Sequence, residues 1–375
     1  MICRARELEP ARLEDDVGIR ALLRSSPMPG RIRLTLEREP AFDPAISAGA
    51  DRTHTFVHRD PATGRILGLA QRSVSRVWLD GRPRLLGYLT LLRCAPELRI
   101  TAELLRAGFA ACESTRREDE LSFDLTSILE ENVRARRLLE RGLPGLPVYR
   151  RLCRFVTLTL DVGSALRRCG GHRASELEIR RACAGDARAL AGFLADAQAR
   201  HPLSDVWTEQ DLLVEGRRWN LAPEDFHLAL RAGVIAGCLA LWDQRPFKQT
   251  VVRGYSPGLA LARTFFNPVA GVLGRARLPS AGTVLPMAFL SHLALQPEEP
   301  ELLVELVRAA LLSARSRRIR YVVIGLAEQH PLLPVLRERF RGHELASLLY
   351  LVHPAGIALA DGVGPGVPHP EVARL

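Results

Sequence analysis

Residues 84–142 constrain the fold more than any other part of this chain. They open with an apolar run at 85–94 that is short and bounded like a buried strand. Pro96 ends this strand, because proline has no N–H group to give to a sheet ladder. From Thr101 onward, apolar residues recur at every third or fourth position with charged residues between them, which predicts an amphipathic helix.

A second strand and a second helix follow in the same segment. Residues 121–128 alternate between apolar and polar side chains, which is typical of a strand. Asn132 is placed as the N-cap of the next helix, and Gly142 as the residue just after its end. The order strand, helix, strand, helix predicts a right-handed βαβ unit with parallel strands.

Two parts of this unit resemble the acyl-CoA-binding motifs of the GNAT acyltransferases. In that family the fourth strand ends in V-x-P and continues as [Q/R]-x-x-G-x-[G/A] into a helix, and the next strand leads to N-x-x-A-x-x-L. Here residues 94–96 (Cys-Ala-Pro) stand in for V-x-P, and Arg99 fits the Q/R position. Asn132, Ala135 and Leu138 match the second motif in full.

The resemblance implies a mixed α/β sheet that splays between these two strands, with acetyl-CoA or another acyl-CoA bound in the cleft. N–H groups at a helix N-terminus, together with the positive end of its dipole, suit a pyrophosphate. Ala102 takes the glycine position of the motif and Leu104 the final position, where its side chain narrows the approach. The cofactor-binding residues that the resemblance implies are Leu92, Cys94, Arg99, Ile100, Thr101, Ala102, Leu104 and Asn132.

The chain has 375 residues, which suggests two domains. The second half repeats the order of the first, with a strand and helix at 177–197, a hairpin near Gly233 and a central strand at 285–295 that also ends before a proline. We predict two tandem GNAT-like domains, each a splayed mixed β-sheet flanked by helices. They span residues 1–162 and 177–355, with a linker at 163–176 and a loose tail at 356–375.

Several further elements are predicted from local patterns. Residues 2–6 form a first strand, 13–23 and 32–39 helices, and 53–58 and 66–78 a hairpin. Strands at 155–160 and 345–352 close the first and second sheets. The insertion at 245–280 is either a loop over the cleft or a contact between domains. Glu298, Glu299 and Glu301 stand where the second copy would bind phosphate, so this copy is expected to shape the structure or the substrate site instead.

Charge and cysteine content narrow the function classes. The formal net charge is +10, carried almost entirely by arginine, but the basic clusters are short and lack interleaved aromatic residues. Nucleic acid is therefore not an expected partner, and an RNA-associated factor is kept as a minor alternative. Seven irregularly spaced cysteines support neither a disulfide framework nor a metal site, so no metal is expected. The absence of an apolar leader or spanning run predicts a cytoplasmic chain without membrane contact.

Acyl transfer to an amine needs a base, donors near the thioester oxygen and an acid for the leaving thiolate. The GNAT family often places a tyrosine seven residues after the motif asparagine and an acidic residue on the fourth strand. Here these positions hold Leu139 and Leu91. The remaining candidates are Glu131, Tyr149 and Asp124, for which the alternatives are a helix-dipole carboxylate, an aromatic anchor and a solvated strand residue.

The second copy offers one more candidate. His292 lies on its central strand, and Glu328 and His330 precede its last helix. A His–Glu pair that meets across the cleft could be a general base, although isolated histidines on strands are more often structural. The expected function is transfer of an acyl group, with acetyl as the expected one, from acyl-CoA to an amine of an unknown acceptor. The alternative is a non-catalytic GNAT-fold protein that binds acyl-CoA or another partner.

Overall fold

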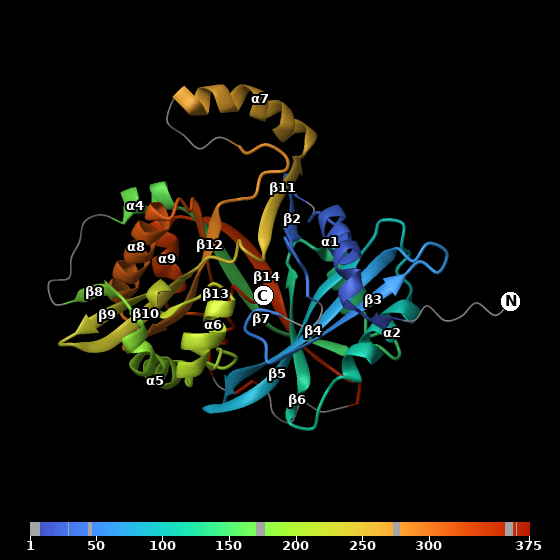
Figure 1. Ribbon diagram of the computed structural model, residues 1–375, viewed down its shortest axis with the longest axis horizontal. Coiled ribbons are helices and arrows are strands. Elements are labelled where there is room, and N and C mark those ends of the chain that lie inside the picture. The colour runs from blue at the N-terminus through green and yellow to red at the C-terminus, as the bar shows by residue number, and fades with distance from the viewer. Residues whose placement is uncertain are drawn as a thin grey trace.

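The computed structural model describes residues 8–28, 30–43, 47–169, 177–272, 278–356, 363–364 and 366–375. Most of its strands join one mixed, twelve-stranded sheet with helices packed against it (Figure 1). The strand order is β1-β3-β4-β5-β6-β14-β7-β13-β12-β10-β9-β8, and β2 and β11 form a separate two-stranded sheet. We call the residues up to 169 the first half and those from 177 the second half.

The first half contains β1 (Glu9–Pro10), η1 (Leu13–Asp15), α1 (Asp16–Ser25), β2 (Ile32–Glu37), β3 (Arg52–Arg59), β4 (Ile66–Leu79), β5 (Arg82–Cys94), α2 (Ala102–Glu113), β6 (Glu120–Leu129), α3 (Val133–Leu139), β7 (Val148–Asp161) and α4 (Val162–Arg168).

The second half contains β8 (Glu178–Arg181), η2 (Ala184–Asp186), α5 (Ala187–Gln198), η3 (Asp211–Glu215), α6 (Gly216–Arg218), η4 (Pro223–Asp225), β9 (Phe226–Arg231), β10 (Val234–Trp242), β11 (Gln249–Tyr255), α7 (Pro257–Val272), β12 (Met287–Leu295), α8 (Pro300–Ser316), β13 (Tyr321–Ala327), α9 (Leu333–Phe340) and β14 (His343–His353).

The predicted βαβ unit is present. A two-residue turn with positive φ at Asp80 (51°) and Gly81 (70°) joins β4 to β5, as expected for a tight hairpin. β5 and β6 are parallel, and α2 connects them. Thr101 and Asn132 are the N-caps of α2 and α3 and accept hydrogen bonds from the backbone N–H groups three residues on. The local signals in this segment therefore predicted its elements correctly.

The two halves exchange a strand. β7 of the first half pairs with β14 and β13, which both belong to the second half. β14 in turn lies between β6 and β7, so both of its neighbours come from the first half. The predictions that residues 155–160 close the first sheet and that residues 345–352 close the second are therefore wrong. Each half supplies the strand that completes the sheet of the other, and the twelve-stranded sheet includes strands of both halves.

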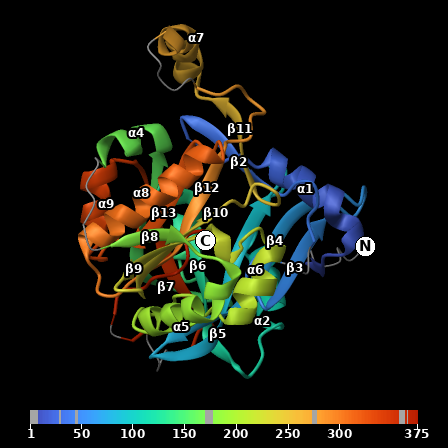
Figure 2. The same cartoon turned by 60° about the vertical axis from the view of Figure 1, so that its left-hand side comes forward.

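Residues 32–37 form the strand β2, so the helix predicted for 32–39 is wrong. Ile32, Leu34 and Leu36 alternate with polar residues, and β2 pairs along its length with β11 of the insertion. The Arg253 guanidinium on β11 lies 2.5 Å from the carboxylate of buried Glu37. The insertion is thus a contact between the two halves, and α7 projects from the body beyond β11 (Figures 1 and 2).

Two predicted irregular segments contain packed residues. Residues 162–168 form α4, so the predicted linker begins as a helix, while 170–176 lie outside the described residues. The described end of the predicted loose tail is packed, because Val372 and Ala373 are 7% and 2% exposed. Residues 357–362 and 365 of that tail, and the strand predicted at 2–6, lie outside the described residues. No helix in the described ranges is both long and apolar enough to cross a membrane.

Candidate functional site

The parallel strands β5 and β6 separate halfway along their length. They are paired from Leu85 to Tyr88 on β5, whereas β5 stays paired with β4 as far as Cys94. At the point of separation the Tyr88 hydroxyl lies 2.8 Å from the Ser127 hydroxyl, and the Thr126 hydroxyl donates to the backbone oxygen of Leu89. The splay expected between these two strands is therefore present.

A β-bulge at Leu91 distinguishes the free end of β5. The register between β4 and β5 shifts at this place, and Leu91 has a φ of +53°. Its side chain is 6% exposed and packs in the core, where the family often has an acidic residue. The second half repeats the feature, because His292 on β12 has a φ of +54° and the register of β10 and β12 also shifts. The same bulge in both halves agrees with the duplication that is predicted from the sequence.

The N-terminus of α2 offers backbone donors beside this opening. Thr101 Oγ1 accepts from the N–H of Leu104 at 3.2 Å, so that group is not available to a ligand. The N–H groups of residues 99–103 have no hydrogen-bond partner among the residues that the structure describes. Unpaired N–H groups at the positive end of a helix dipole form an anion site.

A large cavity of about 1890 Å³ begins between the parted strands and continues between the two halves. Five of the eight predicted cofactor-binding residues line it, and the other three, Arg99, Thr101 and Ala102, lie next to them at the start of α2. The lining members of the predicted set are Leu92, Cys94, Ile100, Leu104 and Asn132. The Asn132 side-chain oxygen is used to cap α3, which it does by accepting from Ala135 N–H at 3.2 Å.

The predicted catalytic candidates lie in different environments. Asp124 is 3% exposed and paired with Arg72 at 2.9 Å and with Arg116 at 3.0 Å, so its carboxylate is already neutralised, and it is not among the residues that line the cavity. It is neither a solvated strand residue nor a free base. Glu131 is exposed and lines the cavity. Tyr149 also lines the cavity and packs edge to face against Phe109 and Tyr350, and burial raises the pKa of its hydroxyl.

The His–Glu pair considered for the second half does not form. Glu328 lies 2.5 Å from the Arg154 guanidinium on β7. The ring of His292 is 1% exposed, and its Nδ1 lies 2.9 Å from the Ser291 hydroxyl. His330 instead lies near Glu298, at 4.0 Å. None of His292, Glu328 and His330 therefore has the predicted partner.

Two titratable side chains at the cavity were not predicted from the sequence. Lys248 follows β10 in the insertion and donates a hydrogen bond to the backbone oxygen of Ala373 at 3.1 Å. Burial, with a smaller effect of Arg38, lowers the pKa of Lys248 to about 7. Glu371 lies in the C-terminal segment, and burial raises the pKa of its carboxyl to about 7. One signal was available for the first of them, because Lys248 is the only lysine in the chain.

In the second half the corresponding strands, β12 and β13, also separate, but the C-terminal segment of the chain lies in the opening between them. β12 and β13 are paired only from Met287 to Phe289 on β12. At the bulge, Glu371 Oε2 accepts a hydrogen bond from the His292 N–H at 2.7 Å. At the start of α8, Glu299 pairs with Arg231 at 2.7 Å. This arrangement supports the prediction that the second copy has a structural role.

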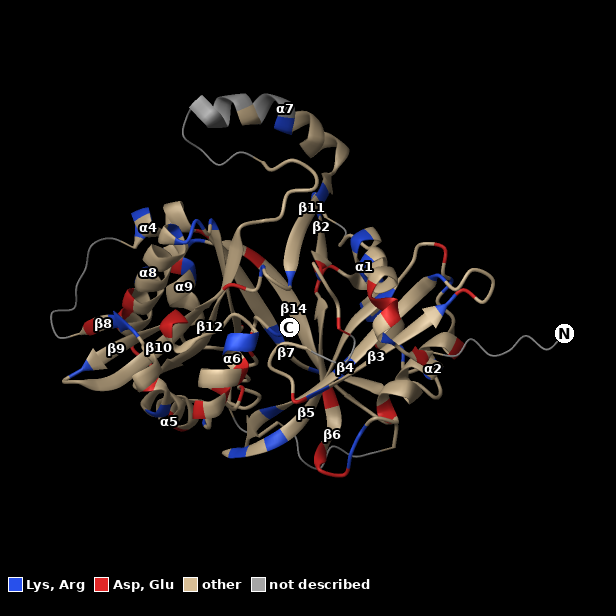
Figure 3. Ribbon diagram, viewed as in Figure 1, with Lys and Arg blue, Asp and Glu red and all other residues tan. Residues whose placement is uncertain are grey.

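The basic residues do not gather along one element. In Figure 3 Lys and Arg positions are spread over both halves and lie among Asp and Glu positions. Many of the arginines form ion pairs within the chain, as Arg72 and Arg253 do. This distribution gives no support to the alternative of an RNA-associated factor, which would need a continuous basic face.

No protein-family model matches the sequence, and no curated protein matches it. Solved structures do match. A tandem GNAT protein from the clavulanic acid biosynthesis pathway aligns with a TM-score of 0.55 at 12% identity, over 94% of this chain and 99% of that one. N-myristoyltransferase of Saccharomyces cerevisiae aligns with a TM-score of 0.55 at 10% identity, over 97% of this chain and 85% of that one.

A GCN5-related N-acetyltransferase from Sphaerobacter thermophilus aligns with a TM-score of 0.51 at 14% identity, over 82% of this chain and 83% of that one. At such identities the likeness concerns the fold alone. It extends over both halves and agrees with the repeated bulge and the repeated parting of strands. The chain therefore has a tandem GNAT fold.

Proposed function

We propose that the first half of this protein binds an acyl-CoA, with acetyl-CoA as the simplest donor, and that the protein transfers the acyl group to an amine. The observation that carries this proposal is the set of unpartnered N–H groups at residues 99–103, beside a cavity that opens between parted strands. Such donors suit the pyrophosphate of CoA. The neighbouring GNAT-fold enzymes support acyl transfer in general.

In the proposed reaction the amine nitrogen attacks the thioester carbonyl, a C–N bond forms, the C–S bond breaks, and CoA leaves as a thiol. The amine must lose a proton, so a neutral base is needed near neutral pH. Lys248 faces the cavity, and its lowered pKa of about 7 leaves a large fraction of it neutral there. It is the group that we propose as the base. The acceptor enters the part of the cavity between the two halves, where Ser73 and Thr157 are among the lining residues.

A non-catalytic protein that binds acyl-CoA is the second candidate. It is favoured by Leu91 and Leu139, which stand at the positions of the family's usual acidic residue and tyrosine and are both 6% exposed. Neither side chain can exchange a proton. In this case the cavity would bind the donor without turnover.

The donor site is tested with Ala102→Asp. A carboxylate in the first turn suits the helix dipole, so this change leaves folding intact while repelling a pyrophosphate. We expect acetyl-CoA affinity, measured by isothermal titration calorimetry, to fall about tenfold or more, which corresponds to about 1.4 kcal/mol. The matched control is Glu301→Gln in the first turn of α8, which should leave the affinity unchanged. Equal binding by wild type and Ala102→Asp would contradict the proposed donor site.

The two candidates are separated by turnover. Wild-type protein is incubated with acetyl-CoA and a broad panel of primary amines, and thiol release is followed with a thiol-reactive dye. Release that depends on the amine supports the transferase. Binding in the calorimeter with no release above the rate of hydrolysis for any amine supports the non-catalytic protein.

A further inference from the structure

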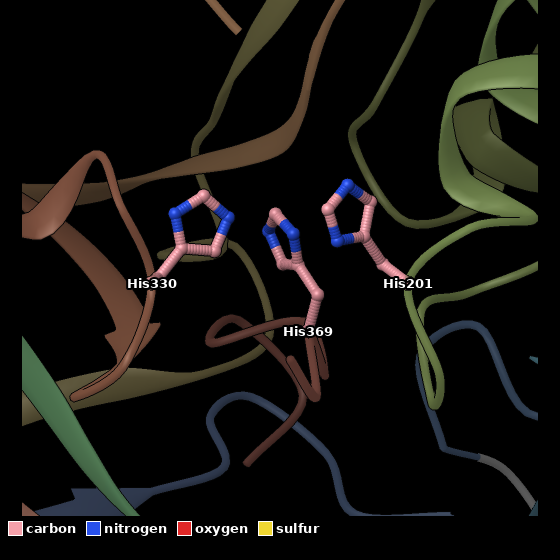
Figure 4. Close-up of side chains that lie close together, drawn as sticks. All are labelled: His201, His330 and His369. Carbon is pink, nitrogen blue, oxygen red and sulfur yellow. The ribbon is translucent and has the colours of Figure 1, made fainter. Parts of the chain in front are cut away.

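Three histidines from distant parts of the sequence meet in the second half. His201 follows α5, His330 lies between β13 and α9, and His369 belongs to the C-terminal segment. One ring nitrogen of each can be chosen so that all three lie within 4.8 Å of one another. Figure 4 shows the ring of His369 between the other two rings, each of which turns a nitrogen toward it.

Two of these ring nitrogens are otherwise unexplained. Within the described part of the chain, His330 Nε2 and His369 Nδ1 are buried and have no hydrogen-bond partner. Buried polar atoms without partners are uncommon in native proteins, because no hydrogen bond offsets the desolvation free energy that each one costs. A cavity of about 10 Å³ lies among the three rings, which is close to the room needed by one water molecule or one metal ion.

A carboxylate completes the group. Glu298 Oε1 lies 3.0 Å from His201 Nε2 and 4.0 Å from His330 Nε2, and Glu298 lines the same small cavity. Three imidazoles with one carboxylate form a ligand set that suits zinc and similar transition metals, whereas magnesium and calcium prefer oxygen ligands alone.

We propose that His201, His330 and His369, together with Glu298, bind one divalent transition metal ion of the zinc class. Tetrahedral bonds of about 2.0 Å require nitrogen atoms about 3.3 Å apart, so metal binding draws the three rings closer together. Coordination through His330 Nε2 also places the ring proton on Nδ1. A protonated Nδ1 can no longer accept the hydrogen bond that Leu332 N–H donates to it at 3.2 Å. Metal binding at Nε2 therefore replaces this hydrogen bond.

The position of His369 gives the metal a structural role. The segment that carries it continues to Glu371, which binds the His292 N–H at the bulge of β12. The backbone N–H of His369 also donates to the oxygen of Pro202 at 2.9 Å. The metal would therefore hold the C-terminal segment in the opening of the second half, at the place that corresponds to the donor site of the first half. This inference does not depend on the proposed acyl transfer.

Cobalt is the probe that tests the site. Untagged full-length protein is treated with a chelator, dialysed and titrated with Co²⁺, which absorbs visible light strongly when it is four-coordinate. We expect saturation at one Co²⁺ per chain, displacement of the absorption by Zn²⁺, and a higher Tm with either ion. A flat visible spectrum, or a spectrum of six-coordinate cobalt only, would overturn the proposal.

Variants assign the ligands. His369→Gln should weaken Co²⁺ binding at least tenfold, because it removes one of four bonds, and should abolish the increase in Tm. The matched control is His343→Gln, an exposed histidine on β14, which should bind as wild type does. Unchanged affinity in His369→Gln overturns the assignment. If this variant does not fold, as judged by circular dichroism, the stoichiometry and spectrum of the wild type decide the question alone.

Discussion

At the scale of single residues, Gly87 on β5 lies beside a buried cluster of charged side chains from the neighbouring strands β4 and β6. Arg72, which is fully buried, pairs with Glu120 at 2.5 Å and with Asp124 at 2.9 Å. Gly87 is paired with Asp124 on the neighbouring strand. A Cβ atom there would lie 2.0 Å from Asp124 Oδ1 and 2.6 Å from Arg72 Nη2. Only glycine leaves room for the ion pairs behind the parted strands.

We therefore expect Gly87→Ala to destabilise the protein by about 2–3 kcal/mol, since overpacking adds to disruption of a buried ion pair. Urea denaturation followed by circular dichroism measures the change. Gly192→Ala is the matched control, because Gly192 lies in α5 with no atom within 4 Å of an added Cβ. It should gain up to about 1 kcal/mol from helix propensity. Equal stability of the two variants would contradict the packing argument.

Lys248 determines the expected pH dependence. A base acts in its neutral form, and the pKa of Lys248 is lowered to about 7 by burial. The rate of acyl transfer at limiting acyl-CoA concentration should therefore increase with pH and level off above about 7, provided that the acceptor amine is already neutral over this range. An acceptor of low pKa, such as an aniline, meets that condition.

Substitution of Lys248 tests its role directly. Lys248→Met removes the base, and Lys248→Arg keeps a permanent charge, so both should lower kcat by about a hundredfold or more and remove the dependence on pH. Donor affinity should change little, because the N–H groups of residues 99–103 are untouched. A Lys248→Met variant with the rate and profile of the wild type would exclude this residue as the base.

At the scale of elements, the start of α2 is positioned by its cap. Thr101 Oγ1 accepts from Leu104 N–H, and Leu105 N–H donates to the Thr101 oxygen. Thr101→Ala should cost about 1 kcal/mol of stability and weaken acetyl-CoA binding by loosening the first turn. Thr101→Ser keeps the hydroxyl and should behave as wild type. Loss of stability without loss of affinity would show that the donor does not use this helix.

The elements that local signals determine were predictable, and those that depend on distant partners were not. Thr101 and Asn132 cap helices through hydrogen bonds to residues three positions on, and Asp80 and Gly81 form a local turn. The βαβ unit could therefore be placed from sequence alone. Residues 32–37 have no such signal. They form a strand by pairing with β11, which lies more than two hundred residues further along the chain.

The same limit applies to the site. The start of α2 and Asn132 follow from a motif, and the structure places them beside one cavity. The histidine cluster has no motif, because His201, His330 and His369 are contributed by separate segments of the second half. The environment of Asp124 could not be predicted, because strand alternation does not reveal that Arg72 and Arg116 pair with its carboxylate.

At the scale of the whole molecule, the exchanged strands make the halves interdependent. Within the described residues, β7 pairs only with β13 and β14, and β14 pairs only with β6 and β7. Leu349 on β14 and Phe155 on β7 are fully buried at this junction. A half on its own would lack both sheet partners of one central strand and would expose its apolar side chains.

We therefore expect neither half to fold alone when the chain is cut within residues 170–176. Residues 1–169 and 177–375 expressed separately should be insoluble or lack a cooperative thermal transition. Coexpressed halves, with an affinity tag on one of them only, should copurify in equal amounts and show a transition close to that of the intact chain. A cooperative transition in the isolated first half would contradict the exchange, because that half would then close its own sheet with β7 beside β6.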